Sequence, residues 1–277
     1  MPHKYQNRRT FSLAASEGLE VRYYVSREDK EYEPRVFPPH VHDFLELYIL
    51  LEGDVSFMVE DKIFSLRPGD VVLSKPNELH HCVLNSTSVH RHACFWIDAT
   101  SKTLAAPFLT VPSGAGNLIR PTEEDSVAIL DILLHLAEEG EGFDSLEHLR
   151  LLCEMLCLVR RNIQVQEVEE EMHPPLLQCI LRDMAEYYRE IADLDYFTDK
   201  YFISRSTLNR LFRQHLGTTP HMYLETKRLA HSRELLKQGK SVTEACTESG
   251  FCDCSHFIRL FRNRFEITPL QYKNSNA

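Results

Sequence analysis

Two stretches of the sequence carry histidine and carboxylate side chains at spacings that suit ligand binding. The candidate residues are His40, His42, Glu46 and His80, with His81 next to the last of them. Residues two apart on a β-strand lie on the same face, so His40 and His42 can point together into one interior. Imidazole and carboxylate groups are ligands for Zn, Mn, Fe or Ni ions. We expect this group either to hold a divalent metal ion or to line a small-molecule pocket.

A second set of residues has the chemistry needed to read DNA. Ser204 can cap a helix whose buried stripe is formed by Leu208, Leu211 and Phe212. The opposite face then carries Arg, Ser and Asn side chains, namely Arg205, Ser206, Asn209, Arg210 and Arg213. Arg suits guanine edges and Asn suits adenine edges in the major groove, and Arg also contacts phosphates. The sequence therefore predicts a DNA-recognition helix in this segment.

The same pattern recurs nearer the C-terminus. Phe257, Leu260 and Phe261 repeat the spacing of the first buried stripe, and Arg259 falls where Arg210 falls in the first helix. The outward-facing candidates of this second helix are Cys254, Ser255, His256 and Arg259. Two related units of this kind predict two helix-turn-helix motifs.

The distribution of charge supports a nucleic-acid partner although the net charge of −10 does not. Residues 174–277 carry 15 Lys and Arg against 12 Asp and Glu, whereas residues 1–173 carry 16 against 29. Residues 204–240 hold eight basic and two acidic side chains, and we expect Lys227 among the basic ones to contact phosphates electrostatically. Screening limits electrostatic reach to ~10 Å, so the local balance matters more than the total.

The first 120 residues have the pattern of short β-strands. Runs rich in β-branched and aromatic residues alternate with turns that contain Gly, Pro and Asp; the runs are Phe44–Leu51, Val55–Glu60, Lys62–Leu66, Val71–Leu73 and His92–Ile97. Regular spacing between the turns predicts a β-barrel or sandwich.

Helical periodicity follows the strands. Thr122 has the sequence context of a helix start, Glu139–Gly142 ends that helix, and Ser145 begins a second one. The apolar stripe of the first helix is formed by Val127, Leu130, Leu133, Leu134 and Leu136. The stripes of the two helices could pack on the barrel or on a second subunit, and we favour a dimer contact.

We therefore predict an α+β, multidomain chain. The expected divisions are a β-barrel at residues 1–120, a helical pair for dimerisation at 121–163, a polar linker at 164–173 and an all-α DNA-binding domain at 174–277.

Residues 176–273 resemble the DNA-binding domain of AraC-type transcriptional regulators. The resemblance is carried by Leu208-x-x-Leu-Phe-Arg, Gly217-x-Thr-Pro-x-x-Tyr-Leu, Gly250-Phe-x-Asp-x-Ser-x-Phe-x-Arg-x-Phe-Arg and Thr268-Pro-x-x-Tyr-Lys. It implies that the two recognition helices enter successive major grooves roughly 34 Å apart. Three positions depart from the family pattern: Phe202 and Glu266 replace glycines, and Ser232 replaces an alanine.

The N-terminal histidines resemble the two motifs of the cupin barrel. His40-x-His-x3-Glu-x6-Gly is similar to the first, and Pro68-Gly-Asp followed by Pro76-x3-His-His-x3-Asn is similar to the second. Glu78 stands where a glycine is expected. His80 fits the version found in regulators, and His81 fits the spacing of metal-binding cupins. The resemblance implies a barrel that senses a small molecule, for which a sugar is one candidate.

Together these features predict a DNA-binding transcription regulator of the activator type, not an enzyme. The expected partners are double-stranded DNA, a small-molecule effector and a second copy of the chain, with RNA polymerase a further candidate. A metal-dependent cupin enzyme fused to a DNA reader is the alternative, and a barrel that only dimerises is a third reading. No cofactor is certain, and a divalent metal ion in the barrel is the candidate.

The remaining sequence signals favour a cytoplasmic chain without a membrane span. No apolar stretch approaches the roughly 18 residues of a membrane span, and the N-terminus lacks a signal-peptide pattern. The eight cysteines show no paired zinc spacing, and we expect reduced thiols, with redox sensing by Cys252 and Cys254 a minor alternative.

Overall fold

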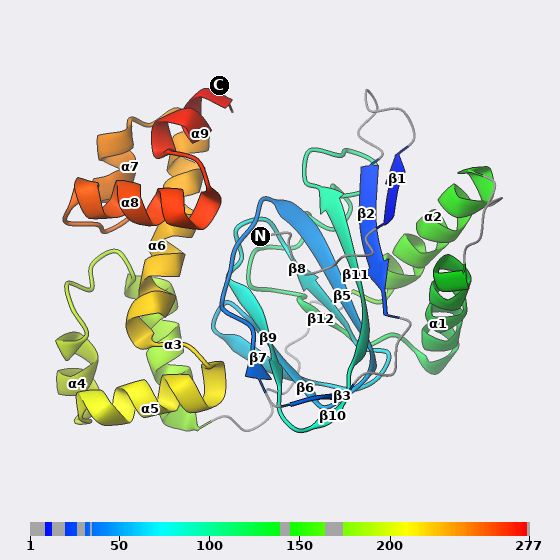
Figure 1. Cartoon of the computed structure of the whole chain (residues 1–277), viewed down its shortest axis with the longest axis horizontal. Helices are drawn as coiled ribbons and strands as arrows, with labels where there is room; N and C mark the ends of the chain where they lie inside the picture. Colours follow the sequence, from blue (N-terminus) through cyan, green and yellow to red (C-terminus); the bar gives the residue numbers. More distant parts are fainter. Residues whose placement is uncertain are drawn as a thin grey trace.

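The computed structural model describes residues 9–12, 20–26, 31–33, 35–138, 145–163 and 174–275. It shows a β-rich domain with two helices on one side and a domain of helices on the other (Figure 1). The expected linker at 164–173 and the expected helix stop at Glu139–Gly142 lie outside the described residues.

The strands of the first domain form two main antiparallel sheets that face each other. The larger has the order β1-β2-β11-β5-β8-β12, the smaller has the order β4-β9-β6-β7, and β10 pairs with β3. The bounds are β1 Arg9–Ser12, β2 Glu20–Val25, β3 Glu31–Tyr32, β4 Arg35–Val36, β5 Phe44–Glu52, β6 Val55–Val59, β7 Lys62–Leu66, β8 Val71–Ser74, β9 His80–Leu84, β10 Ser88–Val89, β11 Arg91–Asp98 and β12 Leu118–Ile119. The five strands predicted from the sequence are confirmed as β5, β6, β7, β8 and β11.

Alternation along β5 and β11 builds two apolar cores on opposite faces of the larger sheet. Leu47 of β5 and Phe95 of β11 belong to the cluster that also contains residues of the two following helices. Tyr48 and Trp96 belong instead to the cluster inside the barrel. Because both faces are buried, these strands read as continuous apolar runs in the sequence. Glu46 is paired with Trp96 across the β5–β11 ladder and therefore belongs to the inner face.

Helices α1 (Glu123–Glu138) and α2 (Ser145–Arg161) cover the outer face of the larger sheet (Figure 1). The backbone N–H of Asp125 donates to Thr122 Oγ1 at 3.2 Å, which confirms the predicted helix start. The main apolar stripe of the pair packs on the sheet, contrary to our expectation of a dimer contact, because the apolar outer face of a sheet needs a cover. Val127 and Leu134 were expected in this stripe but are 63% and 61% exposed.

The C-terminal domain contains two helix-turn-helix units joined by a long helix. Its described helices are α3 Pro175–Tyr187, α4 Asp195–Tyr201, α5 Arg205–Leu216, α6 Pro220–Lys237, α7 Val242–Glu248, α8 Cys254–Phe265 and α9 Pro269–Ser275. Helix α6 runs from the unit of α4 and α5 to the unit of α7 and α8 (Figure 1). Phe212 lies in one apolar cluster and Phe257 in another, so each unit has its own core. No helix in the described ranges is long and apolar enough to cross a membrane.

The three departures from the family pattern have local explanations. Phe202 ends α4 with φ of +52°, and Glu266 ends α8 with φ of +63°. Glycine is favoured at such left-handed positions because it has no Cβ to clash. Ser232 is fully buried within α6, and its hydroxyl donates to the backbone oxygen of Leu229 at 2.8 Å. This hydrogen bond lets a polar side chain occupy a position suited to alanine.

Replacing Phe202 with glycine should stabilise the protein by ~0.5–1 kcal/mol. The left-handed backbone costs a non-glycine residue about 1–2 kcal/mol, part of which is offset by the greater flexibility of glycine in the unfolded chain. The Phe202 side chain is 95% exposed, so its removal sacrifices little packing. Chemical denaturation measures the change. The control Met222→Gly, at a half-exposed position within α6, should destabilise instead. An unchanged or lower stability of Phe202→Gly would contradict this account.

Candidate functional site

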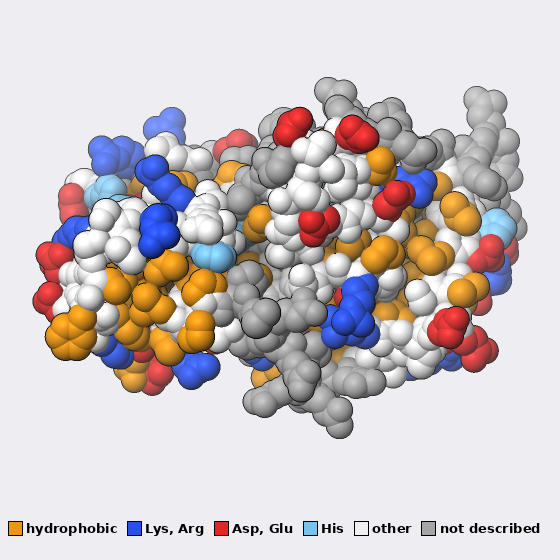
Figure 2. All heavy atoms as spheres, turned by 90° about the horizontal axis from the view of Figure 1, so that it is seen from below, with side chains coloured by type: hydrophobic (Ala, Val, Ile, Leu, Met, Phe, Trp, Pro, Cys, Tyr) orange, Lys and Arg blue, Asp and Glu red, His pale blue; other side chains and the backbone are white. Residues whose placement is uncertain are grey.

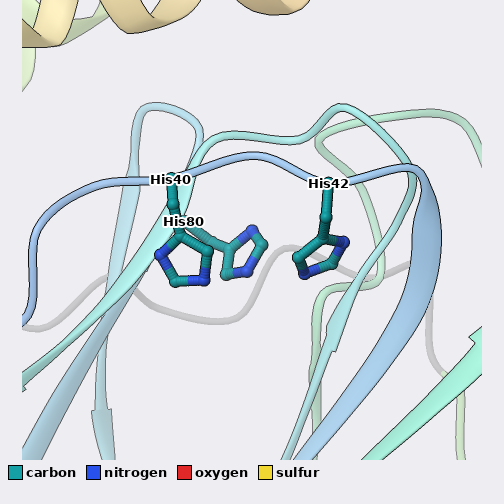
Figure 3. Close-up of side chains that lie close together, drawn as sticks. All are labelled: His40, His42 and His80. Atoms are coloured by element: carbon teal, nitrogen blue, oxygen red, sulfur yellow. The ribbon is translucent and has the colours of Figure 1, made fainter. Parts of the chain in front are cut away.

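His40, His42 and His80 lie close together between the segment that precedes β5 and the start of β9 (Figure 3). The backbones of His40 and His80 exchange two hydrogen bonds, at 3.0 and 3.1 Å, which fixes the two segments side by side. The ring centroid of His80 is 4.4 Å from that of His40 and 4.6 Å from that of His42. One ring nitrogen of each histidine lies within 4.8 Å of the others.

Backbone carbonyl groups orient all three imidazole rings. The Nδ1 atoms lie 2.9–3.1 Å from backbone oxygens, pairing His40 with Pro38, His42 with Phe44 and His80 with Glu78. A carbonyl oxygen can only accept, so each Nδ1 carries the hydrogen and donates it. In a neutral ring the lone pair is then on Nε2. Metal-ligating histidines in proteins have this arrangement, in which one nitrogen is held by the protein and the other is left for the ion.

Glu46 brings a carboxylate to the same cluster from β5. Its Oε2 lies 3.3 Å from His42 Nε2, and its Oε1 lies 3.8 Å from His80 Nε2. The indole N–H of Trp96 donates to Glu46 Oε2 at 2.5 Å. This role of Trp96 was not predicted from the sequence. The signal that could have found it is the cross-strand pairing of the two residues in the β5–β11 ladder.

Burial sets the protonation of the cluster. It is the main cause that lowers the pKa of His80 to about 4, and it also holds the pKa of His40 well below the ordinary value, with a further contribution from His80. Burial alone would raise the pKa of Glu46, but its close contact with His42 and the neighbouring histidines His80 and His40 lower it below the ordinary value. A neutral imidazole, as at His40 and His80, and an ionised carboxylate are the forms that bind a metal ion.

The structure places His80, not His81, with the other candidates. His81 is also fully buried but is the next residue along β9, and it pairs with Met58 in the β6–β9 ladder. Glu78, which departs from the cupin pattern, supports the site. Its carboxylate accepts hydrogen bonds of 2.8 Å from three donors, the backbone N–H groups of Lys75 and Gly114 and the side chain of Asn117. It thereby fixes the turn whose carbonyl holds His80.

Helix α5 presents the first set of predicted DNA-reading residues to solvent. Ser206, Asn209, Arg210 and Arg213 line an open depression of about 590 Å³ together with Gln214, which the sequence analysis did not single out. Arg205 is turned toward Asp195, with 2.7 Å between its Nη2 and the carboxylate Oδ2. Several Lys and Arg side chains are visible on the surface of the helical domain (Figure 2). The side chains that line the depression are therefore accessible to a DNA groove.

The second set of predicted DNA-reading residues, on helix α8, is only partly exposed to solvent. Ser255 and Arg259 are exposed. Cys254 is partly buried against the core of its unit, and His256 Nε2 lies 3.6 Å from Glu225 Oε1. Ser255 and Arg259 therefore have the freer access to a ligand.

Two basic residues of the predicted patch face the barrel, not solvent. Lys227 forms an ion pair with Glu60 and is 12% exposed at its side chain. Arg233 Nη2 lies 2.9 Å from Asp43 Oδ2, and its side chain is 4% exposed. The prediction that Lys227 contacts phosphates was wrong, because the side of α6 that carries Lys227 and Arg233 faces the first domain.

The fold and the two sites define a class of protein, a regulator that joins an effector-binding barrel to a double helix-turn-helix reader. Residues 22–152 match the family described as AraC-like ligand binding domain, and residues 197–275 match the family described as Helix-turn-helix domain. The chain belongs to the AraC-type transcriptional regulators.

Relatives with established names agree with this assignment. The HTH-type transcriptional activator RhaS of Enterobacter sp. (strain 638) is 27% identical over 265 residues, which cover 87% of this chain and 90% of the relative. RhaS of Escherichia coli (strain SMS-3-5 / SECEC) is 26% identical over 260 residues, covering 86% and 89%. Among solved structures, ToxT from Vibrio cholerae is 13% identical with a TM-score of 0.38, covering 92% of this chain and 98% of that one. The two family matches identify the chain as a DNA-binding transcription regulator with an N-terminal effector-binding domain.

Proposed function

We propose that this regulator senses a divalent transition-metal ion at His40, His42, His80 and Glu46. The observation that carries the proposal is the orientation of the rings, in which all three Nδ1 atoms donate to backbone carbonyls. Three imidazoles and one carboxylate suit Zn²⁺, Fe²⁺, Co²⁺ or Ni²⁺. When bound, the ion would be held by the Nε2 lone pairs of the three rings and by the carboxylate of Glu46, and it would add positive charge to the barrel.

Metal content tests the proposal directly. We expect elemental mass spectrometry of untagged protein, purified without chelators and after addition of Zn²⁺ and gel filtration, to find close to one metal ion per chain. A fully folded protein that retains no metal would contradict the proposal. The histidines would then be polar groups in the wall of a pocket for an organic effector such as a sugar. In that case, small molecules would be screened for effects on DNA binding.

We infer a sensory role for the cluster, not a catalytic one. The RhaS relatives are transcriptional activators, and the family that matches residues 22–152 is described as a ligand binding domain. A metal-dependent dioxygenase or isomerase activity would require turnover of a substrate by the metal-loaded protein. Sensing requires only that the ion change the affinity for DNA.

For the DNA end we propose that Arg210 of α5 and Arg259 of α8 read bases. They occupy equivalent positions in the two units, and both are exposed. Ser206, Asn209 and Ser255 are the neighbouring polar groups that could add contacts to bases or phosphates. Arg205, Arg213, Cys254 and His256 complete the proposed interface.

We also propose a homodimer formed through the outer face of α1. Val127 and Leu134 lie seven residues apart on one helical face and are 63% and 61% exposed, and Leu146 of α2 is 69% exposed. Replacing Val127 and Leu134 together with aspartate should convert a dimer to a monomer without unfolding the barrel, since neither side chain is in the core. Sedimentation equilibrium measures the change. The same molecular mass for the wild type and the variant would contradict this interface.

A further inference from the structure

Two cysteines lie against each other across the turn of the second helix-turn-helix unit. Cys246 belongs to α7, and Cys254 is the first residue of α8, the second predicted recognition helix. Both side chains belong to the same apolar cluster, and their thiols are in close contact. All eight cysteines of the chain are free thiols. The pair therefore places two reduced sulfur atoms together at the start of a helix that we expect to read DNA.

The backbone of the turn holds the two cysteines in this position. The N–H of Phe251 donates to the backbone oxygen of Cys246 at 3.0 Å, and the thiol of Cys246 donates to the backbone oxygen of Phe251 at 3.7 Å. Gly250 has φ of +89°, and a Cβ added there would lie 2.6 Å from the backbone oxygen of Arg189. The turn is thus closely packed, and the contact between the thiols is a fixed feature of the unit.

The two thiols differ in their access to solvent. Cys246 is fully buried, whereas Cys254 is half-buried. Burial raises the pKa of the Cys246 thiol, and its contact with Cys254 raises it further. The thiolate is the form of cysteine that reacts with oxidants. Cys246 is therefore protected from direct oxidation, and a small oxidant reaches Cys254 first.

We propose that hydrogen peroxide converts Cys254 and Cys246 to a reversible disulfide, and that this bond weakens the reading of DNA by α8. In the first step the sulfur of Cys254 attacks the peroxide, the O–O bond breaks, and the products are a sulfenic acid and water. In the second step the sulfur of Cys246 attacks the sulfenic sulfur, and the oxygen leaves with the thiol proton as a second water. Two thiols lose two electrons, and one peroxide is reduced to two waters. A dithiol reductant reverses the bond by exchange.

A disulfide at this place would move the start of the recognition helix. A sulfur–sulfur bond is about 2.0 Å long, much shorter than a contact between two thiols, so the first turn of α8 must shift toward α7. Ser255 and Arg259 are carried on the same helix and would shift with it. The effect on DNA rests on the proposed role of α8, whereas formation of the disulfide does not.

Cys252 is the competing partner for either cysteine. The sequence suggested Cys252 and Cys254 as a redox pair, whereas the structure brings Cys246 to Cys254. Cys252 is exposed, and its influence on Cys246 is weaker than that of Cys254. We therefore expect Cys252 to stay outside the disulfide.

The test maps the disulfide and measures DNA binding on the same samples. The full chain is oxidised with hydrogen peroxide in the presence of a chelator, so that no bound metal reacts, and free thiols are then alkylated. Peptide mass spectrometry identifies the linked cysteines. Fluorescence anisotropy measures affinity for a DNA site selected with the reduced wild type, before oxidation, after it and after dithiothreitol. Cys254→Ser and Cys252→Ser are compared with Cys157→Ser, which removes an exposed cysteine of α2.

We expect a peptide that links Cys246 to Cys254, and a DNA affinity that falls roughly 5–150-fold on oxidation and recovers with dithiothreitol. Cys252→Ser and Cys157→Ser should respond like the wild type, and the affinity of Cys254→Ser should not change with peroxide. Absence of this link, or an equal response in Cys254→Ser, would overturn the assignment of the pair. Unchanged DNA affinity of the linked protein would overturn the effect on α8. Wild-type affinity of reduced Arg259→Ala would overturn the proposed role of α8 itself.

Discussion

Replacing His40 and His42 together with alanine should lower metal affinity by more than about 100-fold. Loss of a single hydrogen-bonding partner of a ligand typically costs 10–100-fold, and the double variant removes two ligands outright. The barrel should stay folded, because the apolar clusters around Leu47 and Tyr48 contain neither histidine. Calorimetric titration with Co²⁺ and Zn²⁺ measures the effect.

The control for this prediction removes two histidines that lie away from the site. His135 of α1 and His221 of α6 are exposed, with 54% and 64% of their side-chain surface accessible. His135→Ala/His221→Ala should bind metal like the wild type. Retention of stoichiometric, tight binding in His40→Ala/His42→Ala would show that the ion binds elsewhere in the chain.

Arg210→Ala and Arg259→Ala should each weaken binding to the specific DNA site by ~1–3 kcal/mol, or roughly 5–150-fold. Either variant loses a bidentate contact from Arg to guanine. Both arginines are exposed on the surface of the protein, so the fold should not change. The DNA site is first selected from random sequences with the wild-type chain. Affinity is then measured by fluorescence anisotropy at fixed salt, since DNA affinity depends strongly on salt.

Comparison with unrelated DNA separates base reading from phosphate contact. If the arginines read bases, the loss should be much larger on the selected site than on random DNA. An equal loss on both would make them phosphate contacts. Arg150→Ala on α2 is the control. Arg150 is exposed, belongs to the first domain and pairs only with residues of its own helix, Glu147 and Glu154, among the ion pairs of the described residues. It should bind DNA like the wild type.

The local architecture was predictable from sequence where spacing and caps determine it. Five strands, the start of α1 at Thr122 and the cap of α5 by Ser204 follow from short-range patterns, and the structure confirms them. The family pattern also identified Phe202 and Glu266 as unusual, and the left-handed backbone at both positions gives the physical reason.

Features that depend on packing between distant segments were not predictable. Periodicity shows that α1 has an apolar face but does not tell which partner covers it. Val127 and Leu134 were therefore assigned to the buried stripe, although they are exposed. Charge counting cannot distinguish a lysine that faces DNA from one that faces another domain, which is why Lys227 was misassigned. The choice between His80 and His81 depends on one-residue register in β9, which the two motif versions left open.

The most direct test of the central claim, that a metal ion in the barrel controls DNA binding, is the DNA affinity of the full chain with and without metal. Binding to the selected site is measured by fluorescence anisotropy for metal-free protein and after addition of one equivalent of Zn²⁺ or Co²⁺, in parallel with His40→Ala/His42→Ala. We expect a roughly 5–150-fold change in DNA affinity for the wild type and none for the variant. The same DNA affinity in both states of a wild type that demonstrably binds the ion would contradict it.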